Sequence, residues 1–207
     1  MKVEDLNLFA EPILKYKFNL NCDEILDTLK NLTYVPIEGK DCLRSSDCKS
    51  LLDKLPDLKK SVIQACNDWL NDKMKLNVEF NIIEAWATKT KTGGYSSMHK
   101  HSHCILSGVF YLKDNNQIKI HKPYTSDFWN IEPKEYNKYN SLSYYIESNK
   151  NEMILFPNYI YHQINKYHGQ EDRYSIAFNI LPRGKLGGPT SRITLWHILQ
   201  YFLRQRL

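Results

Sequence analysis

Three histidines at alternate positions, His99, His101 and His103, are the residues in this chain most suited to metal chemistry. In an extended backbone, residues two apart project from the same face, so His99 and His101 can place two imidazoles on one side of a strand. Neutral imidazole is the commonest protein ligand for first-row transition metals. Short motifs of this kind also occur as surface or network histidines, so other residues must decide between the two interpretations.

A histidine and a strand with one polar face further along the chain support the metal site. His162 lies in a β-prone run that follows a proline turn. Residues 173–180 alternate as a strand, on which Arg173 and Ser175 point the same way. His162 supplies a further metal ligand, and a guanidinium beside a hydroxyl suits a carboxylate. The combination predicts a metal site next to an anion site.

These motifs resemble those of the iron(II)- and 2-oxoglutarate-dependent oxygenases, a family with a double-stranded β-helix fold. The chain is most similar to a group of such oxygenases found in marine bacteria and their phages. The resemblance covers about residues 77–182 and depends on joint spacing rather than on any one motif. Its motifs in this chain are Trp86, His99 to His101, Ser107 to Leu112, Phe156-Pro157 with His162, and Arg173 to Asn179.

The resemblance implies a role for each of these residues. His99 and His162 would be imidazole ligands of iron(II). Arg173 would bind the distal carboxylate of 2-oxoglutarate, with help from Tyr111 and Ser175. It also implies a hydroxylase that uses dioxygen and couples the oxidative decarboxylation of 2-oxoglutarate to the oxidation of a substrate, which the sequence does not identify.

One position departs from the pattern of the superfamily. Most members carry an aspartate or glutamate two residues after the first histidine, whereas this chain has His101. Either His101 is a third neutral ligand, or it lies outside the coordination sphere and water completes the site. His103 is a rival to His101. We take His99, His101 and His162 as the expected metal ligands.

Two other functions fit the same residues. A cupin-like metalloenzyme would bind iron, manganese or zinc through three histidines without using 2-oxoglutarate. A non-catalytic β-barrel, such as a phage structural or binding module, would keep the motifs without the chemistry. Consumption of 2-oxoglutarate separates the oxygenase from the cupin-like enzyme, and failure to bind stoichiometric metal would favour the non-catalytic barrel.

Helices are expected before the β-rich region, over residues 21–74. Asn21 can cap a first helix, with Glu24 three residues later as in a capping box. Pro56 is expected to start a new helix, because a proline inside a helix would cost about 3 kcal/mol. We expect these helices to pack against one sheet of the β-helix.

The chain is expected to form one mainly β domain over residues 1–207, with a jelly-roll, cupin-like β-helix core at about 77–182. Residues 183–207 form a C-terminal segment that either docks on the domain or makes an oligomer or membrane-surface contact. An irregular insertion at 123–142 could be a lid over the metal, or could cover the barrel or a dimer contact. Its aromatic residues are Tyr124, Phe128, Trp129, Tyr136 and Tyr139.

Composition bounds the cellular setting. The net charge of +5 is a mild basic bias and not a nucleic-acid signature. No apolar run approaches the ~20 residues that span a bilayer, and the first residues lack a signal-peptide profile, so we expect a cytoplasmic protein, or one in the host cytoplasm if it is viral. The 5 cysteines never occur as Cys-x-x-Cys and indicate reduced thiols. Cys104 and Trp86 are expected to pack as structural residues. The substrate would be a small molecule or a peptidyl side chain, and a homodimer is possible.

Overall fold

The computed structural model describes residues 2, 9–38, 41–123, 131–187, 190 and 193–194. The strands of its large sheet are β1 (Leu14–Lys17), β2 (Tyr34–Pro36), β3 (Leu43–Ser45), β4 (Glu79–Thr90), β6 (Leu106–Tyr111), β9 (Glu152–Pro157) and β11 (Arg173–Arg183). The small sheet contains β5 (Ser96–His99), β7 (Asn116–His121), β8 (Ser143–Ser148) and β10 (His162–Ile164). A separate pair is formed by β12 (Lys185–Leu186) and β13 (Ile193–Thr194).

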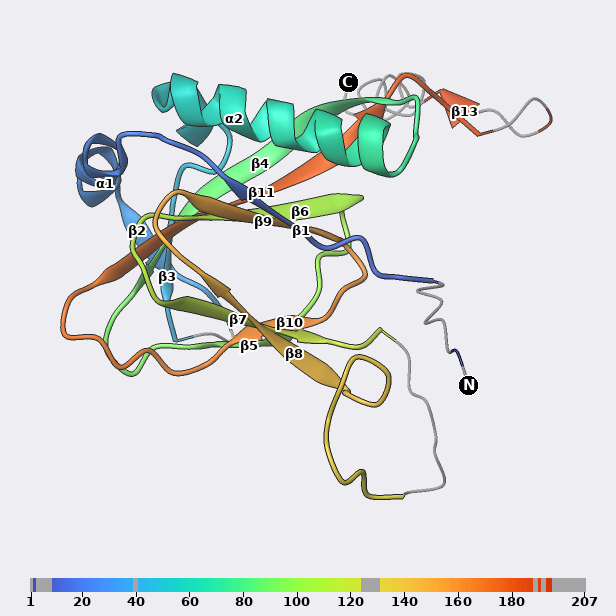
Figure 1. Cartoon of the computed structure of the whole chain (residues 1–207). Helices are drawn as coiled ribbons and strands as arrows, with labels where there is room; N and C mark the ends of the chain where they lie inside the picture. The colour runs from blue at the N-terminus through green and yellow to red at the C-terminus, as the bar shows by residue number, and fades with distance from the viewer. Residues whose placement is uncertain are drawn as a thin grey trace.

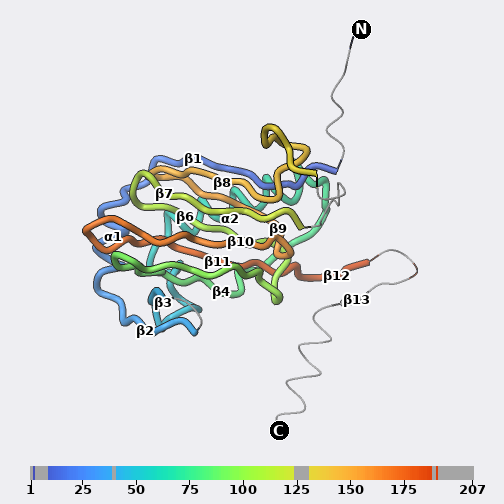
Figure 2. The backbone as a smooth tube through the Cα atoms, turned by 90° about the horizontal axis from the view of Figure 1, so that it is seen from below, coloured from blue at the N-terminus to red at the C-terminus, as the bar shows by residue number. Residues whose placement is uncertain are grey.

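The two larger sheets form a double-stranded β-helix. The order of strands is β1-β9-β6-β11-β4-β3-β2 in the large sheet and β5-β10-β7-β8 in the small sheet, and all the neighbours are antiparallel. Figure 1 shows the small sheet below the large one and the helices above it. Figure 2, seen from below, shows the strands of both sheets running along the same long axis. The expected jelly-roll fold is therefore confirmed.

Two helices, α1 (Cys22–Lys30) and α2 (Pro56–Asn67), cover the outer face of the large sheet. The Asn21 side chain accepts a hydrogen bond from the backbone N–H of Glu24 at 3.4 Å, which confirms the expected cap. Pro56 occupies the first turn of α2, where a proline breaks no helical hydrogen bond. A 3-10 turn, η1 (Leu51–Lys54), precedes α2, and a π-helical turn, η2 (Asp68–Lys73), follows it.

The large sheet separates two hydrophobic clusters. The outer cluster lies between the sheet and the helices and includes Leu29, Val62 and Phe178. The inner cluster lies between the two sheets and includes Ile118 and Phe156. Strands of the large sheet must therefore alternate between two different environments, and their inner faces are available to a site.

Strand β11 is the central strand of the large sheet and has the expected alternation. Tyr174, Ile176 and Phe178 are buried in the outer cluster. Arg173 and Ser175, two apart, point into the space between the sheets, as the sequence predicts. Strand β11 pairs with β4 along one edge and with β6 along the other. This pairing fixes the position and the direction of both side chains.

The structure differs from the sequence-based expectation at two strand ends. The β-prone run that contains His162 forms a strand of only three residues, His162–Ile164. The residues before it form a turn, in which the backbone N–H of Ile160 donates to the carbonyl of Pro157 at 3.1 Å. Strand β11 continues through Pro182, beyond the expected end. Since β6 ends opposite Ile180, Pro182 lies where β11 has one neighbour, a position at which a sheet tolerates proline.

Within the insertion at 123–142, the structure describes residues 123 and 131–142, so Tyr124, Phe128 and Trp129 lie outside the described residues. Most of the segment after 187 also lies outside them. Tyr136 and Tyr139 are exposed and are not among the residues that line the cavity between the sheets. No helix among the described residues has the length and apolar character needed to cross a bilayer.

Candidate metal centre and co-substrate pocket

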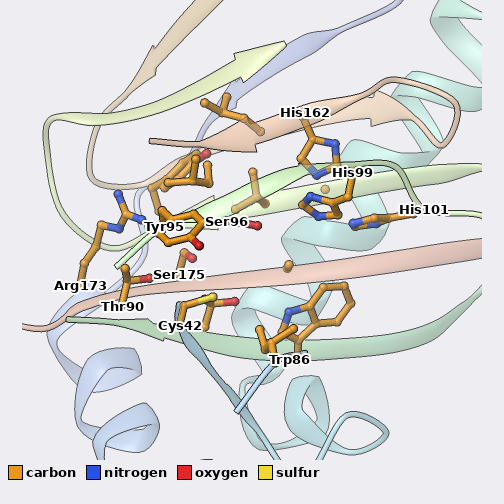
Figure 3. Close-up of a pocket in the computed structure, with 18 of the residues that line it drawn as sticks. Cys42, Trp86, Thr90, Tyr95, Ser96, His99, His101, His162, Arg173 and Ser175 are labelled. Carbon is orange, nitrogen blue, oxygen red and sulfur yellow. The ribbon is translucent and has the colours of Figure 1, made fainter. Parts of the chain in front are cut away.

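The three expected metal ligands converge at one end of the space between the sheets (Figure 3). His99 is the last residue of β5 and His162 the first of β10, and the two are direct partners in the antiparallel ladder. His101 follows β5 and is held by its backbone N–H, which donates to the carbonyl of Asn158 at 3.2 Å. One ligand atom from each imidazole lies within 4.8 Å of the others. The backbone thus presents three imidazoles to one point.

Hydrogen bonds fix which nitrogen of each ring faces that point. Nδ1 of His99 lies 2.8 Å from the carbonyl oxygen of Ser97, and Nδ1 of His162 lies 3.1 Å from that of Ile160. A carbonyl oxygen can only accept, so Nδ1 carries the proton in both rings. In the neutral ring the lone pair is then on Nε2, the nitrogen that would bind a metal. A histidine that binds a metal does so in this neutral form.

The third imidazole, His101, has side chains instead of backbone carbonyls next to its Nδ1. Nδ1 of His101 lies 2.8 Å from Oδ1 of Asn179 and 2.8 Å from Oγ of Ser107. The hydroxyl of Ser107 also donates to the same Asn179 oxygen at 2.8 Å. With Nδ1 of His101 donating to the amide oxygen, its Nε2 lone pair is likewise left for a metal.

His103 and Cys104 lie apart from this group of imidazoles. His103 is exposed and does not belong to the cluster of ligand atoms found in the described part of the chain. Cys104 is buried, and its Sγ lies 3.4 Å from Oγ of Ser107 and 3.9 Å from the carbonyl oxygen of His101. Burial raises the pKa of this thiol, so it remains protonated and packs as a small apolar side chain, as expected.

Trp86 is not a core residue, contrary to the expectation from the sequence. On β4, Ala85 and Ala87 point to the buried outer cluster, so Trp86 between them points to the opposite side. Its ring is only half buried and its centroid lies 5.9 Å from that of His101. Trp86 therefore forms a wall of the cavity beside the imidazoles (Figure 3).

A cavity extends from the imidazoles between the two sheets. Its lining residues come from both sheets and from the loops between β2 and β3 and between β4 and β5. They are Ile37, Cys42, Trp86, Thr88, Thr90, Tyr95, Ser96, His99, His101, Gly108, Val109, Tyr111, Ile118, Phe156, His162, Ile164, Arg173, Ser175 and Ala177. Figure 3 shows Arg173 and Ser175 toward the opposite side of this space from the imidazoles.

Arg173 and Tyr111 make this end of the cavity suited to an anion. The half-buried guanidinium lies 4.9 Å from the ring centroid of Tyr167, and among the described residues it has no carboxylate within ion-pair distance. Burial lowers the pKa of Arg173, against the opposing effect of Tyr111 and Tyr167. The Tyr111 hydroxyl is buried without a hydrogen-bond partner among the described residues, and burial raises its pKa, so it is a neutral donor. Ser175 is the ladder partner of Tyr111. Unpaired buried donors of this kind are costly, and a carboxylate would satisfy them.

Sequence reasoning did not assign several residues of the site. Asn179 continues the alternation of Arg173 and Ser175 on β11, so its place on the inner face could have been found from that period. Cys42 and Tyr95 carry no such signal. They line the cavity because neighbouring loops meet there, where Asp41 and Tyr95 exchange two backbone hydrogen bonds of 3.2 Å.

Comparison with known proteins agrees with this geometry. Residues 84–179 match the family model described as "Putative 2OG-Fe(II) oxygenase". No curated protein matches the chain. Among solved structures, HygX from Streptomyces hygroscopicus with nickel, 2-oxoglutarate and hygromycin B bound is 13% identical, with a TM-score of 0.58 and 83% of each chain covered.

Two hydroxylases have a similar fold. The prolyl hydroxylase from Trichoplax adhaerens, in complex with a hypoxia inducible factor oxygen degradation domain peptide, is 12% identical, with a TM-score of 0.58 and coverage of 84% of this chain and 85% of that one. A prolyl-4-hydroxylase from Pseudomonas putida is 12% identical, with a TM-score of 0.55 and coverage of 86% and 96%. Residues 84–179 are therefore similar to the iron(II)- and 2-oxoglutarate-dependent oxygenases, and the β-helix fold and the imidazole cluster agree with that similarity.

Proposed function

We propose that His99, His101 and His162 hold the iron(II) ion of this oxygenase. The observation that supports the proposal most directly is the convergence of three imidazoles whose ligand atoms lie within 4.8 Å of one another. Each ring has its Nδ1 next to a hydrogen-bond acceptor, which leaves a lone pair on Nε2. The donor set therefore fits a first-row metal ion, with a neutral imidazole in the place of the carboxylate found in most of the superfamily.

We further propose that Arg173, Tyr111 and Ser175 bind the distal carboxylate of 2-oxoglutarate. The unpartnered hydroxyl of Tyr111 and the half-buried guanidinium of Arg173 are both satisfied by a carboxylate. When bound, iron(II) and 2-oxoglutarate supply the oxidising chemistry, in which 2-oxoglutarate is decarboxylated to succinate while dioxygen oxidises the substrate. The chain contributes binding and orientation of the co-substrate, and apolar walls such as Ile118 and Phe156 exclude water.

The proposed reaction is the hydroxylation of a small molecule or of a peptidyl side chain. Structures of similar fold contain either kind of molecule, hygromycin B in HygX and a peptide in the prolyl hydroxylase. We propose one domain for residues 1–207, since structural similarity covers 83–86% of the chain, well beyond residues 84–179. We also propose a reducing compartment such as the cytoplasm, because the structure pairs no two of the described cysteines in a disulfide.

An anaerobic titration tests the oxygenase activity. Protein loaded with iron(II) is titrated with 2-oxoglutarate, and the visible charge-transfer band of the iron(II)–2-oxoglutarate complex is followed. A band that saturates at one equivalent, together with release of succinate in air, is the expected result. Stoichiometric iron without any band would instead favour a cupin-like metalloenzyme, and the absence of stoichiometric metal would favour a non-catalytic barrel.

Two substitutions with matched controls test the residue roles. His162→Ala should abolish iron binding, whereas exposed His168→Ala should leave it unchanged. Full metal occupancy in His162→Ala would contradict the proposed centre. Arg173→Ala should keep the metal and lose affinity for 2-oxoglutarate, whereas Arg183→Ala, on the same strand but paired with Glu79 at the surface, should lose neither. An unchanged co-substrate affinity in Arg173→Ala would place the carboxylate elsewhere.

A further inference from the structure

We propose that Glu84 and Asn179 form a positioning relay that orients His101 and supplies, from outside the coordination sphere, the negative charge that a third imidazole lacks. The inference rests on the proposed role of His101 as a metal ligand. The relay is a chain of two hydrogen bonds that leads from a carboxylate of the large sheet to the imidazole. Neither Glu84 nor Asn179 touches the proposed metal position, so both would act through His101.

The chemistry of the three groups gives the chain a single direction. Nδ2 of Asn179 donates to Oε1 of Glu84 at 2.6 Å, and Nδ1 of His101 lies 2.8 Å from Oδ1 of Asn179. A carboxylate only accepts, so it binds the NH₂ end of the amide and turns the amide oxygen toward His101. That oxygen also only accepts, so Nδ1 of His101 must carry the proton. Glu84 thereby determines, through Asn179, that Nε2 of His101 faces the other imidazoles.

The large sheet holds the relay in one row. Glu84 on β4 and Asn179 on β11 are direct ladder partners, and Ser107 on β6 is the ladder partner of Asn179 on its other side. The three side chains therefore cross three adjacent strands next to His101. Asn179 and Ser107 are buried, with 4% and 0% of their surface exposed. Burial and the three-strand ladder leave the amide of Asn179 little freedom to rotate.

His101 differs in this respect from the other two imidazoles. His99 and His162 face the backbone carbonyls of Ser97 and Ile160, whose positions follow from the chain itself. His101 lies beyond the end of β5, and its Nδ1 faces side chains of the opposite sheet. A ligand outside a strand needs such support to keep its orientation.

The charge of the site supports a role for the Glu84 carboxylate beyond orientation. Three neutral imidazoles leave both charges of an iron(II) ion uncompensated, whereas a two-histidine, one-carboxylate site compensates one of them. Glu84 is half buried and has no ion-pair partner within 4.0 Å among the described residues. A carboxylate held beside a buried amide therefore favours a cation in the cavity, because partial burial reduces screening by water.

Cobalt(II) titration of purified variants tests the relay, because the visible absorption of cobalt(II) reports both affinity and ligand geometry. Asn179→Leu should weaken cobalt(II) binding about 10–100-fold and alter the spectrum, since outer ligand partners have effects of this size. Glu84→Gln keeps an acceptor oxygen but loses the charge, so its affinity should fall several-fold. Asn116→Leu is the matched control, the same change at a buried asparagine that bonds the carbonyls of Lys113 and Ser148, and should leave the affinity unchanged.

A double-substitution cycle separates positioning from general damage to the fold. In a His101→Ala background, Asn179→Leu and Glu84→Gln should cause no further loss of cobalt(II) affinity, because they act through His101. Wild-type affinity in Asn179→Leu, or an equal further loss in the His101→Ala background, would overturn the relay. If Asn179→Leu does not fold, Glu84→Gln alone decides, and an unchanged affinity there would overturn the proposal. Wild-type affinity in His101→Ala itself would instead refute the proposed ligand.

Discussion

Replacement of Tyr111 by phenylalanine should stabilise the ligand-free protein and weaken its binding of 2-oxoglutarate. The Tyr111 side chain is 3% exposed, and its hydroxyl has no hydrogen-bond partner among the described residues. Burial of a hydroxyl without a partner costs about 1–3 kcal/mol in protein substitution data. The ring of phenylalanine keeps the packing against the inner cluster and removes only the oxygen. We therefore expect the free energy of unfolding of the metal-free protein to rise by about 1–2 kcal/mol.

The same substitution should have the opposite effect on the co-substrate complex. A hydrogen bond from a neutral donor to a charged group contributes about 1.5–3 kcal/mol. Because each 1.4 kcal/mol corresponds to about a factor of ten, the Kd for 2-oxoglutarate should rise about 10–150-fold. Arg173 remains in place beside the altered residue, so binding should be weakened but not lost.

Urea unfolding of the metal-free protein and anaerobic titration of the iron-loaded protein with 2-oxoglutarate measure the two effects. Tyr34→Phe is the matched control, because the Tyr34 hydroxyl donates to the carbonyl of Leu29 at 2.9 Å. Loss of that bond should lower stability by about 0.5–1.5 kcal/mol and leave the Kd for 2-oxoglutarate unchanged. The reasoning is refuted if Tyr111→Phe is less stable than the wild type, or if its co-substrate affinity is unaltered.

Two further substitutions and one chemical modification test the packing of the sheet and the helices. Gly108→Ala would bring a Cβ atom into overlap with Cζ of Phe178, so urea unfolding should show a loss of stability of about 1–3 kcal/mol. A neutral effect would mean that the Phe178 ring can move aside. Asn21→Ala removes the cap of α1 and should cost about 1 kcal/mol in the same assay, whereas an unchanged midpoint would show that the 3.4 Å bond contributes nothing. Burial raises the pKa of Cys66 to about 12, so the thiol is protonated at pH 8. It should therefore resist alkylation by iodoacetamide until the protein unfolds. Rapid alkylation of Cys66 in the native protein would contradict its burial.

Local sequence patterns were sufficient for the residues whose position follows from chain spacing. His99 lies at the end of one strand and Arg173 begins another, so period-two reasoning placed their side chains on the same faces as those of His101 and Ser175. The helix starts at Asn21 and Pro56 could be predicted from the sequence, because helix capping depends on neighbours within one turn.

Local sequence patterns did not predict contacts between strands that are far apart in the sequence. Glu84 meets Asn179 only because β4 and β11 pair in one particular register, which shifts immediately after Asn179. A shift of one residue would have turned Glu84 to the opposite face, and no local signal fixes that register. Trp86 was assigned to the core because a lone tryptophan most often packs there. The two faces of β4 are both partly apolar, and only the helices identify the outer one.

With iron on the proposed ligands, the direct pairing of His99 with His162 would link iron supply to the integrity of the small sheet. Strand β5 is the edge of that sheet, is four residues long and has β10 as its strand neighbour. An ion held by both histidines is a cross-link between two segments distant in sequence, and it opposes local opening of the edge. Hydrogen exchange at β5 should accordingly speed up when iron is removed, while the β4–β11 ladder stays protected. An iron-starved cell would then hold a protein with a frayed, protease-sensitive edge, so that iron supply would set its lifetime as well as its activity.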